Sequence, residues 1–157
     1  MRQRLLACGV AVAALAVVVI GAGLAVPAAG GNGPLCVLNT KLVPEEEVPT
    51  STSTAKGQAH IKLFADGTVT WKVHILNRAN EEFMSGHIHR APFGVAGGVV
   101  VPLFATVSPA TERQFRDSGS RSAAASLLAE ICANPGGFYV NYHTTDNPGG
   151  AVRGQLG

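Results

Sequence analysis

The chain has 157 residues, of which 46% are hydrophobic and 14% are charged, so it can form one domain with a core of its own. Its 12 Lys and Arg residues include Arg2 and Arg4 near the N-terminus, which leaves ten basic residues against ten Asp and Glu residues in the rest of the chain. This balance lacks the basic excess that nucleic-acid binding requires, and we expect no nucleic-acid partner.

Residues 1–29 have the composition of a targeting segment. A basic start precedes an uncharged apolar run from Leu5 to Val26, and small residues suited to signal peptidase lie near Ala25 or Ala28. We expect a signal peptide that exports the protein. The apolar run is also long enough to span a membrane, so an uncleaved N-terminal anchor is the alternative, and we expect membrane contact only through this segment. Both alternatives place the domain outside the cytoplasm, either secreted or in the cell envelope.

Residues 30–40 form a linker and the start of the first strand, and residues 41–157 form the domain. Export leaves Cys36 and Cys132 as the cysteines of the mature chain, and an oxidising compartment favours pairing them. We predict a disulfide between them, with two buried free thiols as the alternative. Residues 43–54, rich in proline, glutamate and hydroxyl side chains, are expected to form an exposed loop.

Residues 56–77 have the alternating pattern of a β-hairpin around a three-residue loop at 65–67. The alternation places His60 and His74 on the wetter face of both strands. We interpret these two histidines as solvated side chains, with an accessory metal site as the alternative.

The segment 83–89 is the next expected strand, and it carries His87 and His89. Side chains two residues apart in a strand project to the same face, so the two imidazoles lie together. A glycine-rich loop at 90–98 follows, and then an apolar strand at 99–104 in which Pro102 indicates a sheet edge or a bulge.

Residues 105–121 lack periodicity and are expected to form a long surface connection, with Phe115 turned inward. We expect one short helix, capped by Ser122 and ending before Pro135, with an apolar face that includes Leu128 and Ile131. Strands at 138–143 and 151–156 complete the chain. About seven to eight short strands and one short helix predict an all-β fold, an antiparallel Greek-key-like β-sandwich.

His143 lies at the end of an expected strand, as His87 and His89 do, and all three stand beside glycine-rich turns. We expect the three to form one cluster, which can ligate copper or zinc through neutral imidazole. Asp146, water or an open position would complete the site. Hydrogen-bonded histidines that brace a loop are the alternative. The sequence has no nucleophile elbow and no cysteine expected to stay free, so no catalytic residue is assigned.

Several motifs together resemble the CHRD domain, a family named for repeats in chordin and widespread in bacterial exported proteins. The resemblance runs from about Lys41 to Leu156 and is carried by Glu47-Val48-Pro49, the turn Ala65-Asp66-Gly67-Thr68, Gly86-His87-Ile88-His89 with Gly94 and Gly97, Val99 to Leu103, Tyr139 to Thr144, Asn147 to Gly149 and Arg153 to Leu156. Glu47 and Arg153 both lie in motifs that are otherwise poor in charge, and we expect a structural ion pair between them.

The paired-histidine strand followed by a glycine loop also resembles, at the level of the fold, the sandwich of copper-zinc superoxide dismutase, so we expect a sandwich of the immunoglobulin or superoxide-dismutase type. Bacterial members of the CHRD family mostly lack an assigned activity. We therefore expect an exported cell-envelope protein that acts as a non-enzymatic binding or interaction module for an unidentified partner. A mononuclear copper or zinc protein that uses the histidine cluster is the first alternative. A superoxide-dismutase-like redox enzyme is the second, although three histidines are too few for both metal sites of that enzyme.

Overall fold

The computed structural model describes residues 33–157, which belong to one compact unit. The segment expected to be a signal peptide or membrane anchor, residues 1–29, lies outside the described residues. Between residues 33 and 157, no helix is both long and apolar enough to cross a membrane.

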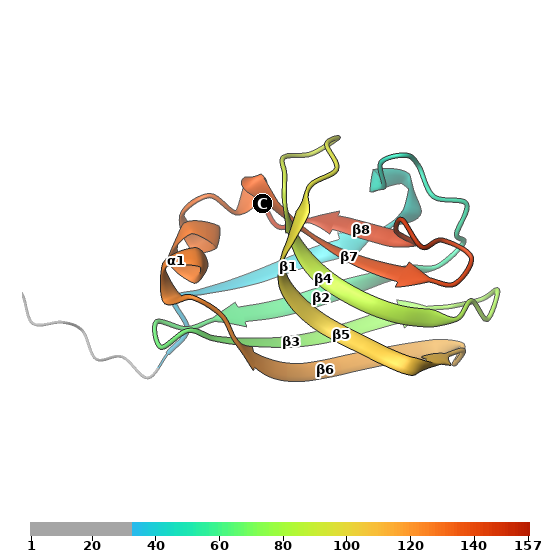
Figure 1. The fold of residues 1–157 in the computed structure, drawn as a ribbon, viewed down its shortest axis with the longest axis horizontal. Coiled ribbons are helices and arrows are strands. Elements are labelled where there is room, and N and C mark those ends of the chain that lie inside the picture. The colour runs from blue at the N-terminus through green and yellow to red at the C-terminus, as the bar shows by residue number, and fades with distance from the viewer. Residues whose placement is uncertain (1–32) are drawn as a thin grey trace, which may run out of the picture. The chain divides into compact units, whose positions relative to one another are not determined.

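Two antiparallel four-stranded sheets pack face to face as a sandwich (Figure 1). Sheet A contains, in spatial order, β1 (Cys36–Leu42), β2 (Lys56–Leu63), β3 (Thr68–Leu76) and β6 (Gln114–Ser122). Sheet B contains β5 (Gly98–Ala110), β4 (Phe83–Arg90), β7 (Phe138–Thr144) and β8 (Val152–Gln155). The neighbours β3–β6 and β4–β7 are not consecutive in the chain, as in Greek-key sandwiches. The expected all-β sandwich of seven to eight strands is confirmed.

Three short helical segments complete the fold: helix α1 (Ala125–Ala133) and the 3₁₀ turns η1 (Pro44–Glu46) and η2 (Pro135–Gly137). Helix α1 lies at one end of the sandwich (Figure 1). It begins after Ala124, which makes no side-chain cap, so the expected cap at Ser122 is wrong because that residue ends β6. Leu128 and Ile131 of the helix are buried in the core, as expected.

The β2–β3 hairpin forms as the alternation predicts. Leu63 pairs with Val69, and Gly67 supplies the turn with a φ of 88°, a conformation that favours glycine. The inward side chains of both strands, among them Ile61, Trp71 and Ile75, enter the core between the sheets. Alternation therefore sends His60 and His74 to the outward face of sheet A.

The expectation for residues 105–121 is wrong, because this segment is the end of β5 and most of β6. Strand β6 pairs with β3 along its whole length, yet its inward positions are Phe115, Asp117 and Gly119 rather than an apolar series. A Cβ on Gly119 would collide with the ring of Trp71. Asp117 accepts hydrogen bonds of 2.6 Å from Trp71 Nε1 and Tyr142 Oη, which satisfies its inward carboxylate. Phe115 is buried, as expected.

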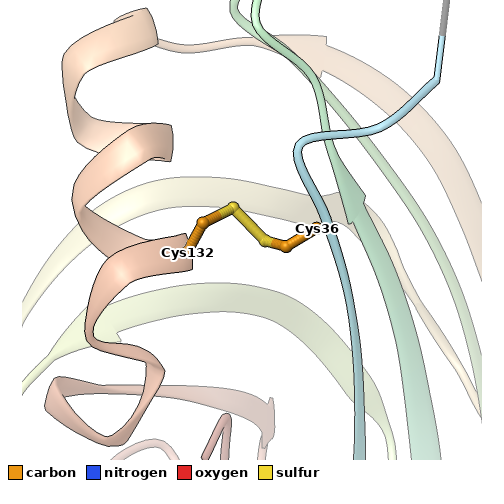
Figure 2. The surroundings of a disulfide bond; sticks show 2 residues. All are labelled: Cys36 and Cys132. Carbon is orange, nitrogen blue, oxygen red and sulfur yellow. A yellow bond between two sulfur atoms is a disulfide. The ribbon is translucent and has the colours of Figure 1, made fainter. Parts of the chain in front are cut away.

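A disulfide joins Cys36 on β1 to Cys132 on α1, 96 residues apart in the chain, as the sequence predicts (Figure 2). Figure 2 shows the helix held against the start of β1 by this bond. The disulfide therefore ties the first strand to the only α-helix of the described residues.

We predict that replacing both Cys36 and Cys132 by alanine lowers the free energy of unfolding by about 2–5 kcal/mol, because the bond closes a long loop and restricts the unfolded chain. Denaturant unfolding of the oxidised chain and the variant measures this loss. Reduction of the wild-type chain should reproduce it. Equal stability of the oxidised chain, the reduced chain and the variant would contradict the prediction.

Candidate metal centre

The outward face of sheet B carries the three histidines of the expected site. Strands β4 and β7 are neighbours, and their register pairs His89 with Tyr139, His87 with Asn141 and Ser85 with His143. His87 and His89 lie two residues apart on β4, and His143 on β7 lies diagonally across from His87. The structure thus brings together all three residues, which alternation alone could do only for the first two.

One nitrogen from each ring lies within 4.8 Å of the other two. The closest approach is 3.2 Å, between His87 Nδ1 and His143 Nε2. Nitrogen ligands about 2.0–2.1 Å from a tetrahedral zinc ion lie roughly 3.4 Å apart, so this pair already has the spacing of two ligands. The third nitrogen, that of His89, lies within 4.8 Å of the other two, so tetrahedral coordination needs an inward shift on the order of 1 Å.

Backbone carbonyls fix the orientation of the other two rings. His89 Nδ1 donates to Gly97 O at 2.9 Å, and His143 Nδ1 donates to Pro148 O at 2.9 Å. A carbonyl oxygen only accepts hydrogen bonds, so the Nδ1 of each ring carries the proton and Nε2 carries the lone pair. A histidine that binds a metal commonly has its other nitrogen held in this way.

His89 Nε2 is buried and has no hydrogen-bond partner among the described residues. Buried polar atoms are nearly always satisfied, and an exception calls for an explanation such as an unfilled ligand position. His89 has a nitrogen within 4.8 Å of a nitrogen of each of the other two rings, and Nε2 is the nitrogen of this ring that Gly97 does not hold. The cluster therefore has one nitrogen with an unused lone pair, His89 Nε2, and two rings, His89 and His143, whose tautomer is fixed.

The hydrogen bond from His89 to Gly97 O depends on a close approach of the loop backbone at Gly97 to the backbone of β4. A Cβ at this position would collide with the carbonyl of Arg90, so glycine is required for the loop to fold back onto β4. Tyr139 Oη accepts a hydrogen bond of 3.1 Å from Gly97 N, so side chains of sheet B hold both the amide and the carbonyl of Gly97. The glycine-rich loop thus forms one wall of the site, as expected. Gly86, also expected there, instead faces the core against Tyr142.

Burial keeps all three imidazoles neutral. Burial, followed by the charges of His143 and His89, lowers the pKa of His87 to about 4. Burial also lowers the pKa of His89 and that of His143, against the opposing effect of their carbonyl partners. At neutral pH the cluster therefore presents uncharged nitrogen donors, the form that ligates metals.

His89 belongs to a stack of three side chains that continues to the neighbouring strands. The Tyr139 ring lies 4.8 Å from the His89 ring at an interplanar angle of 13°, and the Arg153 guanidinium lies 3.5 Å from the centre of the same Tyr139 ring. A cation over an aromatic face is attracted to it. Nothing in the sequence pattern distinguishes Tyr139 as a supporting residue, because aromatic residues are common in any buried strand.

The expected direct ion pair between Glu47 and Arg153 does not form. Arg153 donates to the carbonyls of Val95 and Pro92, at 2.9 and 3.1 Å, and to Gln155. Glu47 instead accepts from Asn141 Nδ2, at 2.9 and 3.0 Å. The guanidinium, committed to the Tyr139 ring and the loop carbonyls, acts on Glu47 only through its charge.

The remaining expected ligands lie elsewhere. Asp146 is exposed in the β7–β8 turn and is not among the clustered ligand atoms of the described residues. His60 and His74 lie on the outward face of sheet A, away from the cluster, which rests on sheet B. The carbonyls of Gly97 and Pro148 could not be found from the sequence, because any residue supplies a carbonyl.

Comparison with protein families matches residues 38–156 to the CHRD domain, over most of the chain. The chain belongs to the CHRD domain family. The match confirms the resemblance that the motifs indicated between about Lys41 and Leu156. Comparison with the curated proteins and with the solved structures found no match.

We predict a specific pH dependence for Glu47 of the CHRD domain. Burial raises the pKa of its carboxyl to about 7, against the opposing charge of Arg153. The folded chain holds this proton more tightly than the unfolded chain, so the stability it contributes is fully present below pH 4.5 and is lost as the pH rises through 7.

Glu47→Gln does not titrate at this position and serves as the reference. Relative to this variant, the free energy of unfolding of the wild-type chain should fall by an amount on the order of 3 kcal/mol between pH 4.5 and pH 8. Denaturant unfolding of both proteins at a series of pH values measures the difference. A difference that stays constant over this range would contradict the assignment.

Proposed function

We propose that this CHRD-domain chain is an exported, non-enzymatic binding module whose domain holds one copper or zinc ion through His87, His89 and His143. The observation that carries the proposal is the buried His89 Nε2, which has no hydrogen-bond partner among the described residues and belongs to a ring with a nitrogen within 4.8 Å of two further imidazole nitrogens. Buried nitrogens are usually hydrogen-bonded, and although His74 Nε2 on sheet A also lacks a partner among the described residues, only His89 Nε2 belongs to a cluster of three imidazoles.

The donor set favours these two metals over others. Three neutral imidazoles suit zinc and copper, whereas calcium and magnesium prefer oxygen ligands. No carboxylate joins the cluster among the described residues. Three protein ligands leave a fourth position for water or a small ligand, which is the arrangement of open rather than closed zinc sites.

The surrounding contacts support binding of an ion without a large rearrangement. The carbonyls of Gly97 and Pro148 hold two rings by their Nδ1 atoms, so these rings keep their orientation before and after binding. Such contacts raise the basicity of the coordinating nitrogen. When bound, the ion would accept lone pairs from the three imidazoles, so the buried His89 Nε2 would gain a partner.

Export is supported by two features of different kinds. The Cys36–Cys132 disulfide suits an oxidising compartment, because disulfides are rare in the cytosol. The basic start and apolar run of residues 1–29 are typical of a targeting segment. Together they favour a domain that acts outside the cytoplasm, in the cell envelope or beyond it.

We predict that the untagged chain binds one zinc or copper(II) ion. His89→Ala should weaken this binding at least tenfold, because the variant loses the ligand nitrogen His89 Nε2. His60→Ala, which removes a histidine from the other sheet, is the matched control and should bind as the wild type does. Calorimetric titration with each metal measures the affinities.

The lowered pKa of His87 adds a second expectation. Affinity should be retained at pH 6, where an unperturbed imidazole would already compete with protons for the metal. Equal, weak binding by the wild type, His89→Ala and His60→Ala would reject the metal site.

A further inference from the structure

The outward face of sheet A has a charge distribution that the metal site does not explain. Five of the basic residues in the described part of the chain project from this face: Lys41, Lys56, Lys62, Lys72 and Arg116. No Asp or Glu occupies an outward position on these four strands. The described chain as a whole is balanced, so positive charge is concentrated on one side of the molecule.

Four of these cations lack an acidic partner. Lys56 is paired with Glu45 at 3.0 Å, but no carboxylate lies within 4 Å of the basic nitrogens of the others among residues 33–157. Asp117 borders the same region, yet its carboxylate turns inward to Trp71 and Tyr142. The cations therefore face solvent with their charge uncompensated, which favours an anionic partner.

The face is hollowed where the charges gather. Two neighbouring rows cross all four strands in register, one formed by Lys41, Gln58, His74 and Arg116 and the next by Asn39, His60, Lys72 and Ser118. These rows line a hollow of about 580 Å³. This volume lies in the range of ligand sites rather than that of a flat protein surface.

The spacing of the charges favours a ligand with several anionic groups. Strands lie about 4.8 Å apart, so the row from Lys41 to Arg116 spans roughly 14 Å, and Lys72 lies in the next row, about 7 Å away. A single small anion cannot contact all three. An extended chain that carries an acidic group on successive units can do so.

The uncharged lining indicates the chemistry of that chain. Three uncharged polar side chains line the hollow beside the cations: Asn39, Gln58 and Ser118. They can donate hydrogen bonds to hydroxyl groups and accept hydrogen bonds from them. Apart from two imidazoles, no aromatic ring lines the hollow, and aromatic rings are what nucleic-acid bases stack on. The concave shape keeps a flat lipid surface from reaching the floor. We propose that the outward face of sheet A binds an acidic oligosaccharide, a sugar chain that bears carboxylate groups.

Hexagalacturonate, an oligosaccharide with one carboxylate on each sugar, is the probe for this site, and uncharged maltohexaose is its neutral counterpart. Calorimetric titration of the full chain at low salt should show binding of the first and none of the second. Lys72→Glu combined with Arg116→Glu should weaken binding of hexagalacturonate at least tenfold. Added salt should weaken binding by the wild type, because these charges are exposed.

Arg78→Glu combined with Arg113→Glu is the matched control, since it makes the same change in net charge at exposed loop positions outside the hollow. This control should bind as the wild type does, and circular dichroism should show that both variants are folded. Absence of binding, or equal affinity of the two double variants, would overturn the proposal. Tighter binding of duplex DNA or of anionic lipid vesicles than of hexagalacturonate would overturn the assignment to a carbohydrate. The candidate metal site lies on sheet B, so the outcome of these binding experiments does not test the metal proposal.

Discussion

Burial of strand β7 on both faces is the constraint on which the candidate metal centre depends. All seven residues of this strand are buried. Its inward side chains, such as Val140 and Tyr142, pack in the core, while its outward side chains are polar and lie beneath the loops. A polar group without water needs a partner from the protein or from a ligand. The chemistry of the outward face follows from this requirement.

The loops that cover sheet B supply those partners. The β4–β5 loop brings the carbonyl of Gly97 to His89, and the β7–β8 turn brings that of Pro148 to His143. Asn141 between them donates to Glu47. Three buried polar atoms on this face still lack a partner among the described residues: His89 Nε2, Asn141 Oδ1 and Arg153 Nε. Of these, only His89 Nε2 belongs to the imidazole cluster. Sheet A is the opposite case, because its outward face is open to solvent and carries four cations that have no acidic partner within the part of the chain that the structure describes.

Alternation in the sequence was sufficient for the β2–β3 hairpin and for the shared face of His87 and His89, since both depend on the two-residue period of a strand. It failed for β6, where Asp117 occupies an inward position and removes the apolar signal that marks a strand. The hydrogen-bond partner of Glu47 could not be predicted either, because the sequence does not show that the Arg153 guanidinium lies over the Tyr139 ring and that Asn141 donates to Glu47 instead. The family motifs identified the domain, but carbonyl contacts have no signature in the sequence.

The central claim is that the three imidazoles are arranged as ligands for one metal ion, and X-ray absorption at the zinc edge of the zinc-loaded chain tests it most directly. We predict a first shell with three imidazole nitrogens at about 2.0–2.1 Å and one further light atom. In His87→Ala the imidazole scattering should fall by one ligand. A first shell without imidazole scattering, or one that is the same in His87→Ala, would contradict the account.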